Sequence, residues 1–237
     1  MYLVTGSSSG IGKAVYDNLK RTDMVTGIDI LPSDIICDLS FDENIKTLIL
    51  QLANLNKDIE GIVTSAGVIG GKNTIPVNYF GSVRIIEYLY QHYGKVNAVL
   101  VGSNIYTHAK TNNNLISLLL ENKEKEAIDF AKNNQLTDTE VYASCKKALN
   151  FWMRLFIKNN KNSRINIVHP SLMKTGMTEQ YVKSEIIKII FSEDIDKAYI
   201  GGPEEVSGLI CYLIKNSKAV NGQFILVDNG VYDHEAT

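Results

Sequence analysis

The chain opens with the stretch Met1-Tyr-Leu-Val-Thr-Gly-Ser-Ser-Ser-Gly-Ile-Gly12, which decides the fold. The apolar run Tyr2–Val4 predicts a strand, and the residues after Gly12 have the spacing of an amphipathic helix. A strand, a tight glycine turn and a helix N-terminus together bind the pyrophosphate of a dinucleotide. Gly6 permits the turn, Gly10 lets the backbone approach phosphate, and Gly12 lets the helix pack closely on the strand. Such a cluster can also be only a tight turn, so its interpretation depends on the rest of the chain.

Length and composition fit one sizeable α/β domain. The chain has 237 residues, 45% of them hydrophobic, and a formal net charge of -2. Without a cluster of lysines and arginines, it lacks the electrostatic signature of a nucleic-acid-binding protein. The first predicted strand begins at residue 2, which leaves no room for a signal peptide, and the densest apolar run, 115–120, is too short to span a bilayer. We expect a cytoplasmic protein with neither a nucleic-acid nor a membrane partner.

Cysteine and histidine usage predicts neither disulfides nor a metal site. The cysteines are odd in number and lack CxxC spacing, which fits a reducing compartment better than a disulfide framework. The histidines are scattered and show no metal-ligand spacing. These residues are Cys37, Cys145 and Cys211, and His92, His108, His169 and His234.

Strand-like and helix-like runs alternate along the chain. Seven apolar runs are predicted to be strands, and those after the first cover residues 24–28, 34–37, 61–65, 97–101, 164–168 and 223–227. Their continuously apolar character is typical of parallel strands that are covered on both faces. Amphipathic runs at helical spacing, such as the one with Ile45, Leu48 and Leu52, lie between them. The predicted fold is a single α/β domain over 1–237, with a seven-stranded, parallel, doubly wound sheet of the Rossmann type and helices on both faces.

Two segments depart from this alternation. Residues 104–138 are too long for a bare connection, so we predict a helical insertion, with a disordered flap as the alternative. A helix is expected to start at 112–114, and Glu121 and Lys125 are expected to form an i,i+4 pair on it. The segment 176–202 is predicted to form a lid over the carboxyl edge of the sheet, with a helix at 185–191. Its apolar residues include Met177, Ile186, Ile190 and Phe191.

Asp29 lies at the end of the second predicted strand. A carboxylate there can accept hydrogen bonds from both hydroxyls of an adenosine ribose while repelling a 2′-phosphate. Ile30 and Leu31 add no positive charge, and neither does Ser9 in the glycine turn. The pattern predicts NAD(H) rather than NADP(H), with a solvated turn aspartate as the alternative.

Tyr142 and Lys146 are four residues apart within 141–157, whose apolar spacing predicts a helix. On a helix the two side chains share one face, separated by roughly 6 Å of axial rise. A tyrosine with a pKa of about 10 is a poor acid or base at neutral pH, whereas a neighbouring ammonium group stabilises the phenolate. The pair is predicted to perform general acid/base chemistry, with a structural pair as the alternative.

The order of these motifs resembles that of the short-chain dehydrogenase/reductase family over nearly the whole chain. The matching stretches are Thr5–Gly12, Asp38-Leu39, Thr64-Ser-Ala-Gly67, Val77-Asn-Tyr-Phe-Gly81, Ser103, Tyr142-Ala-Ser-Cys-Lys146, His169-Pro-Ser171 with Thr175, and Asn221–Gly230. Gly27–Ile30, Val77–Gly81 and the insertion before Tyr142 are most similar to the bacterial 3α-hydroxysteroid dehydrogenase/carbonyl reductase branch. Thr64-Ser65, Ser171 and Asn229 depart from the family pattern without removing a proposed catalytic group.

The resemblance implies four catalytic residues. Tyr142 would be the general acid/base, and Lys146 would bind the nicotinamide ribose and lower the tyrosine pKa. Ser103 would hydrogen-bond the substrate oxygen, and Asn78 would hold a water in a proton relay. Their simpler alternatives are a helix cap for Asn78 and a strand-end turn for Ser103.

The resemblance also implies a set of cofactor contacts. Asp38 and Leu39 would meet the adenine, Gly67 the adenosine-side ribose, and Thr175 the nicotinamide carboxamide. The full set is Gly6, Ser7, Ser8, Ser9, Gly10, Ile11, Gly12, Asp29, Ile30, Asp38, Leu39, Ser65, Ala66, Gly67, Tyr142, Lys146, Pro170 and Thr175.

Other residues near these motifs are given lesser roles. Cys145 is expected to pack rather than react, and His169 to pack or hydrogen-bond. Tyr106 and His108 follow Ser103 closely and are candidates for substrate contacts.

The expected function is that of an NAD(H)-dependent oxidoreductase that interconverts a secondary alcohol and a ketone on a hydrophobic, steroid-like or other carbonyl substrate. The alternative is a non-catalytic NAD(H)-binding sensor or scaffold, which would not need the intact acid/base set. An epimerase using the same pair is disfavoured, because such relatives usually carry a larger C-terminal substrate domain. We expect a homodimer through residues 203–216 and the last strand, rather than the tetramer common in the family.

Overall fold

In the computed structural model, which describes residues 1–179 and 200–228, seven strands form one parallel sheet. The strands are β1 (Tyr2–Thr5), β2 (Val25–Asp29), β3 (Ile35–Ile36), β4 (Gly61–Thr64), β5 (Val96–Val101), β6 (Ser163–Pro170) and β7 (Phe224–Val227). Their order across the sheet is β3-β2-β1-β4-β5-β6-β7. Every predicted strand is present, and the predicted fold class is confirmed.

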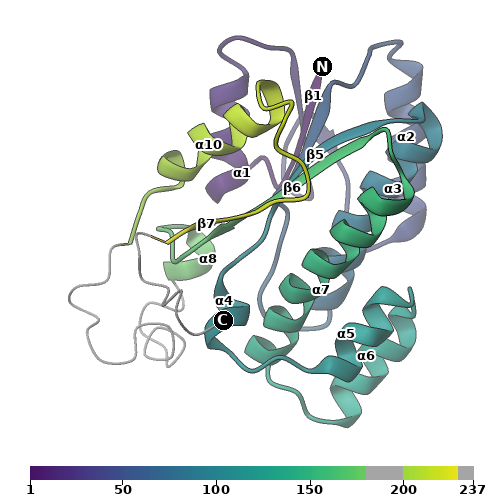
Figure 1. Cartoon of the computed structure of the whole chain (residues 1–237), viewed down its shortest axis with the longest axis vertical. Coiled ribbons are helices and arrows are strands. Elements are labelled where there is room, and N and C mark those ends of the chain that lie inside the picture. The colour runs from purple at the N-terminus through teal and green to yellow at the C-terminus, as the bar shows by residue number, and fades with distance from the viewer. Residues whose placement is uncertain (180–199, 229–237) are drawn as a thin grey trace.

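Helices cover both faces of the sheet (Figure 1). The helices α1 (Gly10–Leu19) and α10 (Pro203–Lys215) pack on one face, and α2 (Asp42–Asn54), α3 (Ser82–Tyr93) and α7 (Asp138–Asn159) pack on the other.

The strands contribute alternate residues to two hydrophobic cores. Leu3 and Ile62 belong to the core under α2, α3 and α7, whereas their neighbours Val4 and Val63 belong to the core under α1 and α10. Successive side chains of a strand point to opposite faces, so a strand that is covered on both sides must be apolar at every position. This explains why the strand sequences are continuously apolar.

The segment between β5 and α7 forms three helices, α4 (Ile105–His108), α5 (Asn113–Leu120) and α6 (Glu124–Asn133). The α5 helix starts where the asparagine run predicted, because the Asn112 side chain accepts hydrogen bonds from the backbone nitrogens of residues 114 and 115. The predicted pair between Glu121 and Lys125 is wrong. The helix ends at Leu120, Asn122 takes a positive φ of 59°, and Glu121 instead pairs with Lys123 at 2.6 Å.

The α5 helix packs against α7, and α6 packs against α5 (Figure 1). Leu115 and Leu119 are buried in the core that α7 shares. On α3, the Arg84 guanidinium forms an ion pair with Glu124 of α6 at 2.8 Å. The insertion is therefore attached to both α7 and α3.

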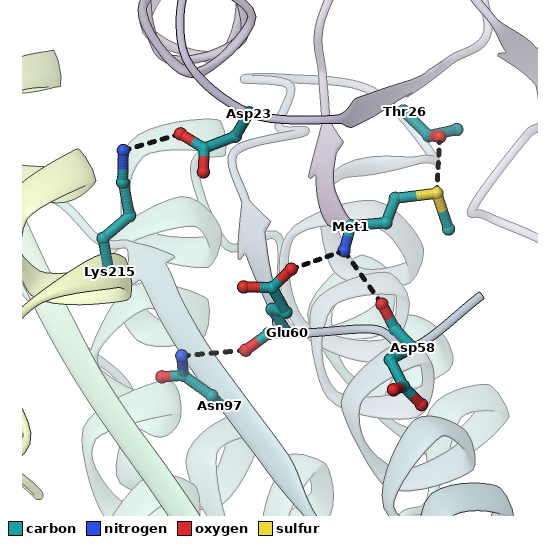
Figure 2. A network of polar contacts seen from close by, with 7 residues as sticks. All are labelled: Met1, Asp23, Thr26, Asp58, Glu60, Asn97 and Lys215. Carbon is teal, nitrogen blue, oxygen red and sulfur yellow. Dashed lines mark hydrogen bonds and ion pairs between the residues drawn. The ribbon is translucent and has the colours of Figure 1, made fainter.

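Polar contacts join several elements at the amino edge of the sheet, opposite the glycine turn (Figure 2). Lys215 at the end of α10 pairs with Asp23 at 2.6 Å. The α-amino group of Met1 lies 2.9 Å from a carboxylate oxygen of Glu60, whose carbonyl oxygen accepts a hydrogen bond from Asn97 at 3.0 Å. These contacts connect the elements around β1, β4 and β5 at the edge that the candidate site does not use.

Most of the predicted lid over 176–202 lies outside the described residues. Its described parts are α8 (Gly176–Glu179) and the segment from residue 200 onward. The lid residues Ile186, Ile190 and Phe191, the side chain of Met177, and also Asn229 and His234, are outside the described part. Among the helices of the described residues, none is long and apolar enough to cross a membrane.

Candidate active site

A cavity of about 380 Å³ opens at the carboxyl edge of the sheet. The segments that follow β1, β2, β4, β5 and β6 line it, because the carboxyl ends of parallel strands meet at one edge. The expected cofactor contacts among its lining residues are Gly6, Ser9, Gly10, Ile11, Asp29, Ile30, Asp38, Leu39, Ser65, Ala66, Gly67, Tyr142, Lys146, Pro170 and Thr175. One cavity thus collects residues that are spread over most of the chain.

The glycine turn needs its glycines for close packing. A Cβ on Gly6, which has a φ of 69°, would lie 2.8 Å from the backbone nitrogen of Ala66, and a Cβ on Gly12 would lie 2.1 Å from the carbonyl oxygen of Gly6. Gly10 lies at the cavity wall, where an added Cβ would meet Thr175 at 3.3 Å. At this end α1 has no side-chain cap, so its first N–H groups remain for an anionic ligand. This end of the cavity therefore fits the pyrophosphate of a dinucleotide.

Three of the expected cofactor contacts, Ser7, Ser8 and Gly12, do not line the cavity. The Ser7 hydroxyl lies 2.7 Å from that of Ser33, and the Ser8 hydroxyl donates to the carbonyl oxygen of Pro32 at 3.0 Å. These serines therefore hold the loop after β2 against the glycine turn.

Asp29 occupies the cavity rim at the end of β2. One carboxylate oxygen accepts a hydrogen bond from the backbone nitrogen of Ser8 at 2.9 Å, and the other accepts from that of Leu31 at 3.0 Å. A carboxylate oxygen can accept more than one hydrogen bond, so both remain able to bind ribose hydroxyls. The two backbone contacts fix the orientation of the carboxylate.

Tyr142 and Lys146 lie on the same side of α7, and both face the cavity. The Lys146 Nζ atom is 5.5 Å from the centre of the Tyr142 ring and donates to the carbonyl oxygen of Val101 at 2.9 Å. Ser103 follows β5 and forms a side-chain hydrogen bond with Tyr142. The helix and the strand end thus bring a phenol, an ammonium group and a hydroxyl together.

Burial shifts the pKa values of both Tyr142 and Lys146. It raises the pKa of Tyr142 above its ordinary value, and the hydrogen bond from Ser103 opposes that rise. Burial also lowers the pKa of Lys146 to about 8. The expectation that Lys146 lowers the tyrosine pKa stays a prediction, and in this structure the Lys146 ammonium group lies over the Tyr142 ring and hydrogen-bonds the carbonyl oxygen of Val101.

Asn78 is fully buried in the π-helix η1 (Pro76–Gly81), which leads into α3, and it does not line the cavity. Its amide nitrogen donates to the carbonyl oxygens of Val68 and Thr74, both at 2.7 Å, and its amide oxygen accepts from the Val68 nitrogen at 3.2 Å. A Cβ on Gly67 would lie 2.8 Å from that oxygen. The side chain therefore holds the cavity loop after β4 through backbone contacts.

The remaining candidates are placed around the site. Cys145 is fully buried, and burial raises the pKa of its thiol to about 12, so it packs as an apolar group. Neither Tyr106 nor His108 is part of the cavity lining that the structure describes. Tyr106 instead packs against the His169 ring, with the ring centres 5.0 Å apart.

Sequence reasoning missed much of the apolar part of the cavity. The unpredicted lining residues include Val68, Ile69, Val77, Ile105, Leu172 and Met173. The pair Leu172-Met173, which begins two residues beyond Pro170 at the end of β6, was a usable signal because ligands bind beyond the carboxyl ends of such strands.

Comparison with known proteins decides the family. A family model described as Enoyl-(Acyl carrier protein) reductase matches residues 9–232. The chain belongs to the short-chain dehydrogenase/reductase family. Members of this family are NAD(P)-dependent oxidoreductases that act on CH–OH groups, and the chain is an oxidoreductase of this class.

Individual relatives of this short-chain dehydrogenase/reductase support the predicted branch. The chain is 26% identical to the 3-alpha-hydroxysteroid dehydrogenase/carbonyl reductase of Comamonas testosteroni, over 97% of this chain and 95% of that protein. It is 24% identical to a 3-oxoacyl-(acyl-carrier-protein) reductase of Buchnera aphidicola, over 97% and 96% of the two chains. The crystal structure of the 3-alpha-hydroxysteroid dehydrogenase from Pseudomonas sp. B-0831 complexed with NADH matches with a TM-score of 0.85 and 26% identity, over 97% of this chain and 95% of that one. The family and branch predicted from the sequence are confirmed.

Proposed function

We propose that this short-chain dehydrogenase/reductase interconverts a secondary alcohol and a ketone with NAD(H), and that Tyr142 is its general acid/base. The observation that carries the proposal is the meeting of Tyr142, Lys146 and Ser103 in the cavity that begins at the glycine turn. A nicotinamide ring bound there would supply or accept the hydride.

Residues of the cavity divide between the cofactor and the substrate. The N-terminus of α1 would hold the pyrophosphate, and Asp29 would bind the adenosine ribose. Lys146 would bind the nicotinamide ribose, and Thr175 would contact the carboxamide. Ser103 would donate a hydrogen bond to the substrate oxygen, where negative charge develops during reduction.

The raised pKa of Tyr142 favours the protonated phenol, which is the form needed to donate a proton to a ketone oxygen. Alcohol oxidation needs the phenolate instead. The nearby positive charge of Lys146 would favour that form, and so would an oxidised nicotinamide. Reduction should therefore extend to lower pH than oxidation does.

Charge at the cavity rim supports NAD(H) over NADP(H). Asp29 would face a 2′-phosphate, and the loop after β2 covers Ser8 without supplying a positive side chain.

Part of the cavity lining is apolar. Val68, Ile69, Ile105, Leu172 and Met173 belong to it, and a substrate bound against them would be a hydrophobic alcohol or ketone. The names of the Comamonas and Pseudomonas relatives include a 3α-hydroxysteroid activity, so a steroid-like substrate is part of the proposal.

We also propose a cytoplasmic homodimer. The sheet edge at β7 carries four half-buried apolar residues, and Tyr212 on the adjoining α10 is 56% exposed. An apolar edge strand beside an exposed aromatic residue is a suitable subunit interface. The three cysteines are free and buried, which is consistent with a reducing compartment.

The test is oxidation of NADH in the presence of a saturated ketosteroid, cyclohexanone and phenanthrenequinone. Tyr142→Phe should lower kcat by about 100-fold or more, as expected for the loss of a general acid, while NADH binding measured by fluorescence is retained. Tyr90→Phe, a matched change on α3 outside the cavity lining, should behave like the parent. Equal turnover by Tyr142→Phe and the parent would refute the mechanism. NADH binding without turnover of any ketone, or of the corresponding alcohols with NAD, would favour a non-catalytic sensor.

A further inference from the structure

His169 is a fully buried histidine near the end of β6, and the proposed reaction gives it no step. Its Nδ1 atom lies 3.1 Å from the backbone nitrogen of Ser103 and 3.0 Å from the carbonyl oxygen of the same residue. Ser103 follows β5, the strand that pairs with β6. One ring nitrogen therefore contacts both polar backbone groups of the residue that carries the proposed substrate-binding hydroxyl.

The fold holds this imidazole from several sides. A Cβ on Gly102 would lie 2.3 Å from Nδ1, so the ring occupies space that any other residue at position 102 would fill. The rings of Tyr106 and Phe224 pack against it edge-on, with centres 5.0 and 6.1 Å away. Contacts from the end of β5, from α4 and from β7 thus fix its orientation.

The ring is neutral at physiological pH. Burial lowers the pKa of His169 to about 4, although the hydrogen bond with the Ser103 backbone opposes this shift, and the charge of Lys146 adds a smaller lowering. A neutral imidazole has one N–H group and one acceptor nitrogen, and an acceptor at Nδ1 can receive the N–H of Ser103. The other nitrogen, Nε2, is then a buried donor with no hydrogen-bond partner among the described residues.

That arrangement argues against a role in packing alone. A buried donor without a partner costs stability that an apolar side chain of similar size would not. A histidine at this position is therefore explained by a hydrogen bond that its acceptor nitrogen makes. Within residues 1–179 and 200–228, the polar contacts of Nδ1 are with the backbone of Ser103.

We propose that His169 is a positioning residue, which holds the Ser103 backbone so that the Ser103 hydroxyl meets the Tyr142 phenol. The inference rests on the proposed function of this site. The Ser103 hydroxyl also accepts a hydrogen bond from the backbone nitrogen of Ile105 at 3.2 Å, so a shift of this backbone displaces the oxygen. Misplacement of a reacting group by about 1 Å can lower a rate by about 100-fold.

The first test compares three variants in the ketone assay described above. His169→Leu replaces the imidazole with an apolar side chain of similar size and removes the acceptor, His169→Asn keeps an acceptor, and His92→Gln changes an exposed histidine on α3. His169→Leu should lower kcat by about tenfold or more, with the Kd for NADH unchanged and a melting temperature no lower than that of the parent. His169→Asn should recover most of kcat, and His92→Gln should have no effect. A parental kcat in His169→Leu would overturn the proposal, as would an equal loss in the Leu and Asn variants accompanied by a lower melting temperature.

The second test does not depend on turnover. Nitrogen NMR of protein labelled in its histidines, with His169 assigned from its variants, reports which ring nitrogen carries the proton. We expect an unprotonated Nδ1 and a protonated Nε2 between pH 6 and 8, and a protonated Nδ1 would overturn the proposal. If the parent turns over no ketone, the proposed function fails, and this measurement still decides whether His169 accepts from Ser103.

Discussion

The ammonium group of Lys146 donates a hydrogen bond to the carbonyl oxygen of Val101 across 2.9 Å, which joins α7 to the last residue of β5. The lysine is 4% exposed and makes no ion pair within the described residues. Burial without a counter-ion destabilises the charged form of the lysine, and its pKa is accordingly lowered to about 8.

Replacing this lysine should stabilise the protein at neutral pH. The free energy of unfolding of Lys146→Met should exceed that of the parent by about 2 kcal/mol at pH 7, less than the full pKa shift implies because the bond to Val101 is lost. Above pH 8 the folded parent loses the proton that the unfolded chain keeps until about 10.5, so the parent gains stability and the difference shrinks. Urea unfolding at pH 7 and pH 10 measures this, with Lys147→Met as the control. A difference that does not change with pH would contradict the prediction.

Asn78→Ala should lower stability and activity together. The substitution leaves the backbone groups of Val68 and Thr74 without their amide partners, which should cost about 3 kcal/mol of unfolding free energy. Thermal unfolding of Asn78→Ala and of the exposed control Asn113→Ala measures the cost. Unchanged stability with lost turnover would instead favour a direct catalytic role for the amide.

Asp29→Ala should weaken the discrimination against NADP(H). The substitution removes the negative charge at the rim that would repel a 2′-phosphate, so kcat/KM for NADPH relative to NADH should rise by about tenfold. Initial rates with both cofactors test this, and Asp17→Asn on the exposed side of α1 is the matched change. An unchanged NADH/NADPH ratio in Asp29→Ala would count against the assignment of Asp29.

Two glycine-to-alanine substitutions should change the stability of the protein in opposite directions. A Cβ on Gly12 would overlap the carbonyl oxygen of Gly6, so Gly12→Ala should lower the free energy of unfolding by about 2–3 kcal/mol and weaken NADH binding. Gly208 lies exposed in α10 with nothing within 4 Å of an added Cβ, so Gly208→Ala should raise the free energy of unfolding by about 0.5–1 kcal/mol. Denaturant unfolding compares the two, and a stabilised Gly12→Ala variant would show that α1 can move away from β1.

The sequence was a good guide wherever a feature depends on neighbouring residues. The apolar runs identified all seven strands, with ends that differ by one or two residues, and the spacing of Tyr142 and Lys146 placed both on one side of a helix. Asn112 identified the start of α5, but the break at Asn122 was missed. A positive φ is one of several backbone conformations that an asparagine can adopt, and the local sequence does not select among them.

By itself the sequence determined the order of strands and helices, the glycine turn and the residues at the carboxyl edge of the sheet, because periodicity and turn chemistry act over short stretches of chain. Only the tertiary structure decided that Asn78 holds the loop after β4, that His169 contacts Ser103, and that burial raises the pKa of Tyr142. Those properties depend on which distant segments pack together and on how completely they exclude water, and no local pattern encodes either.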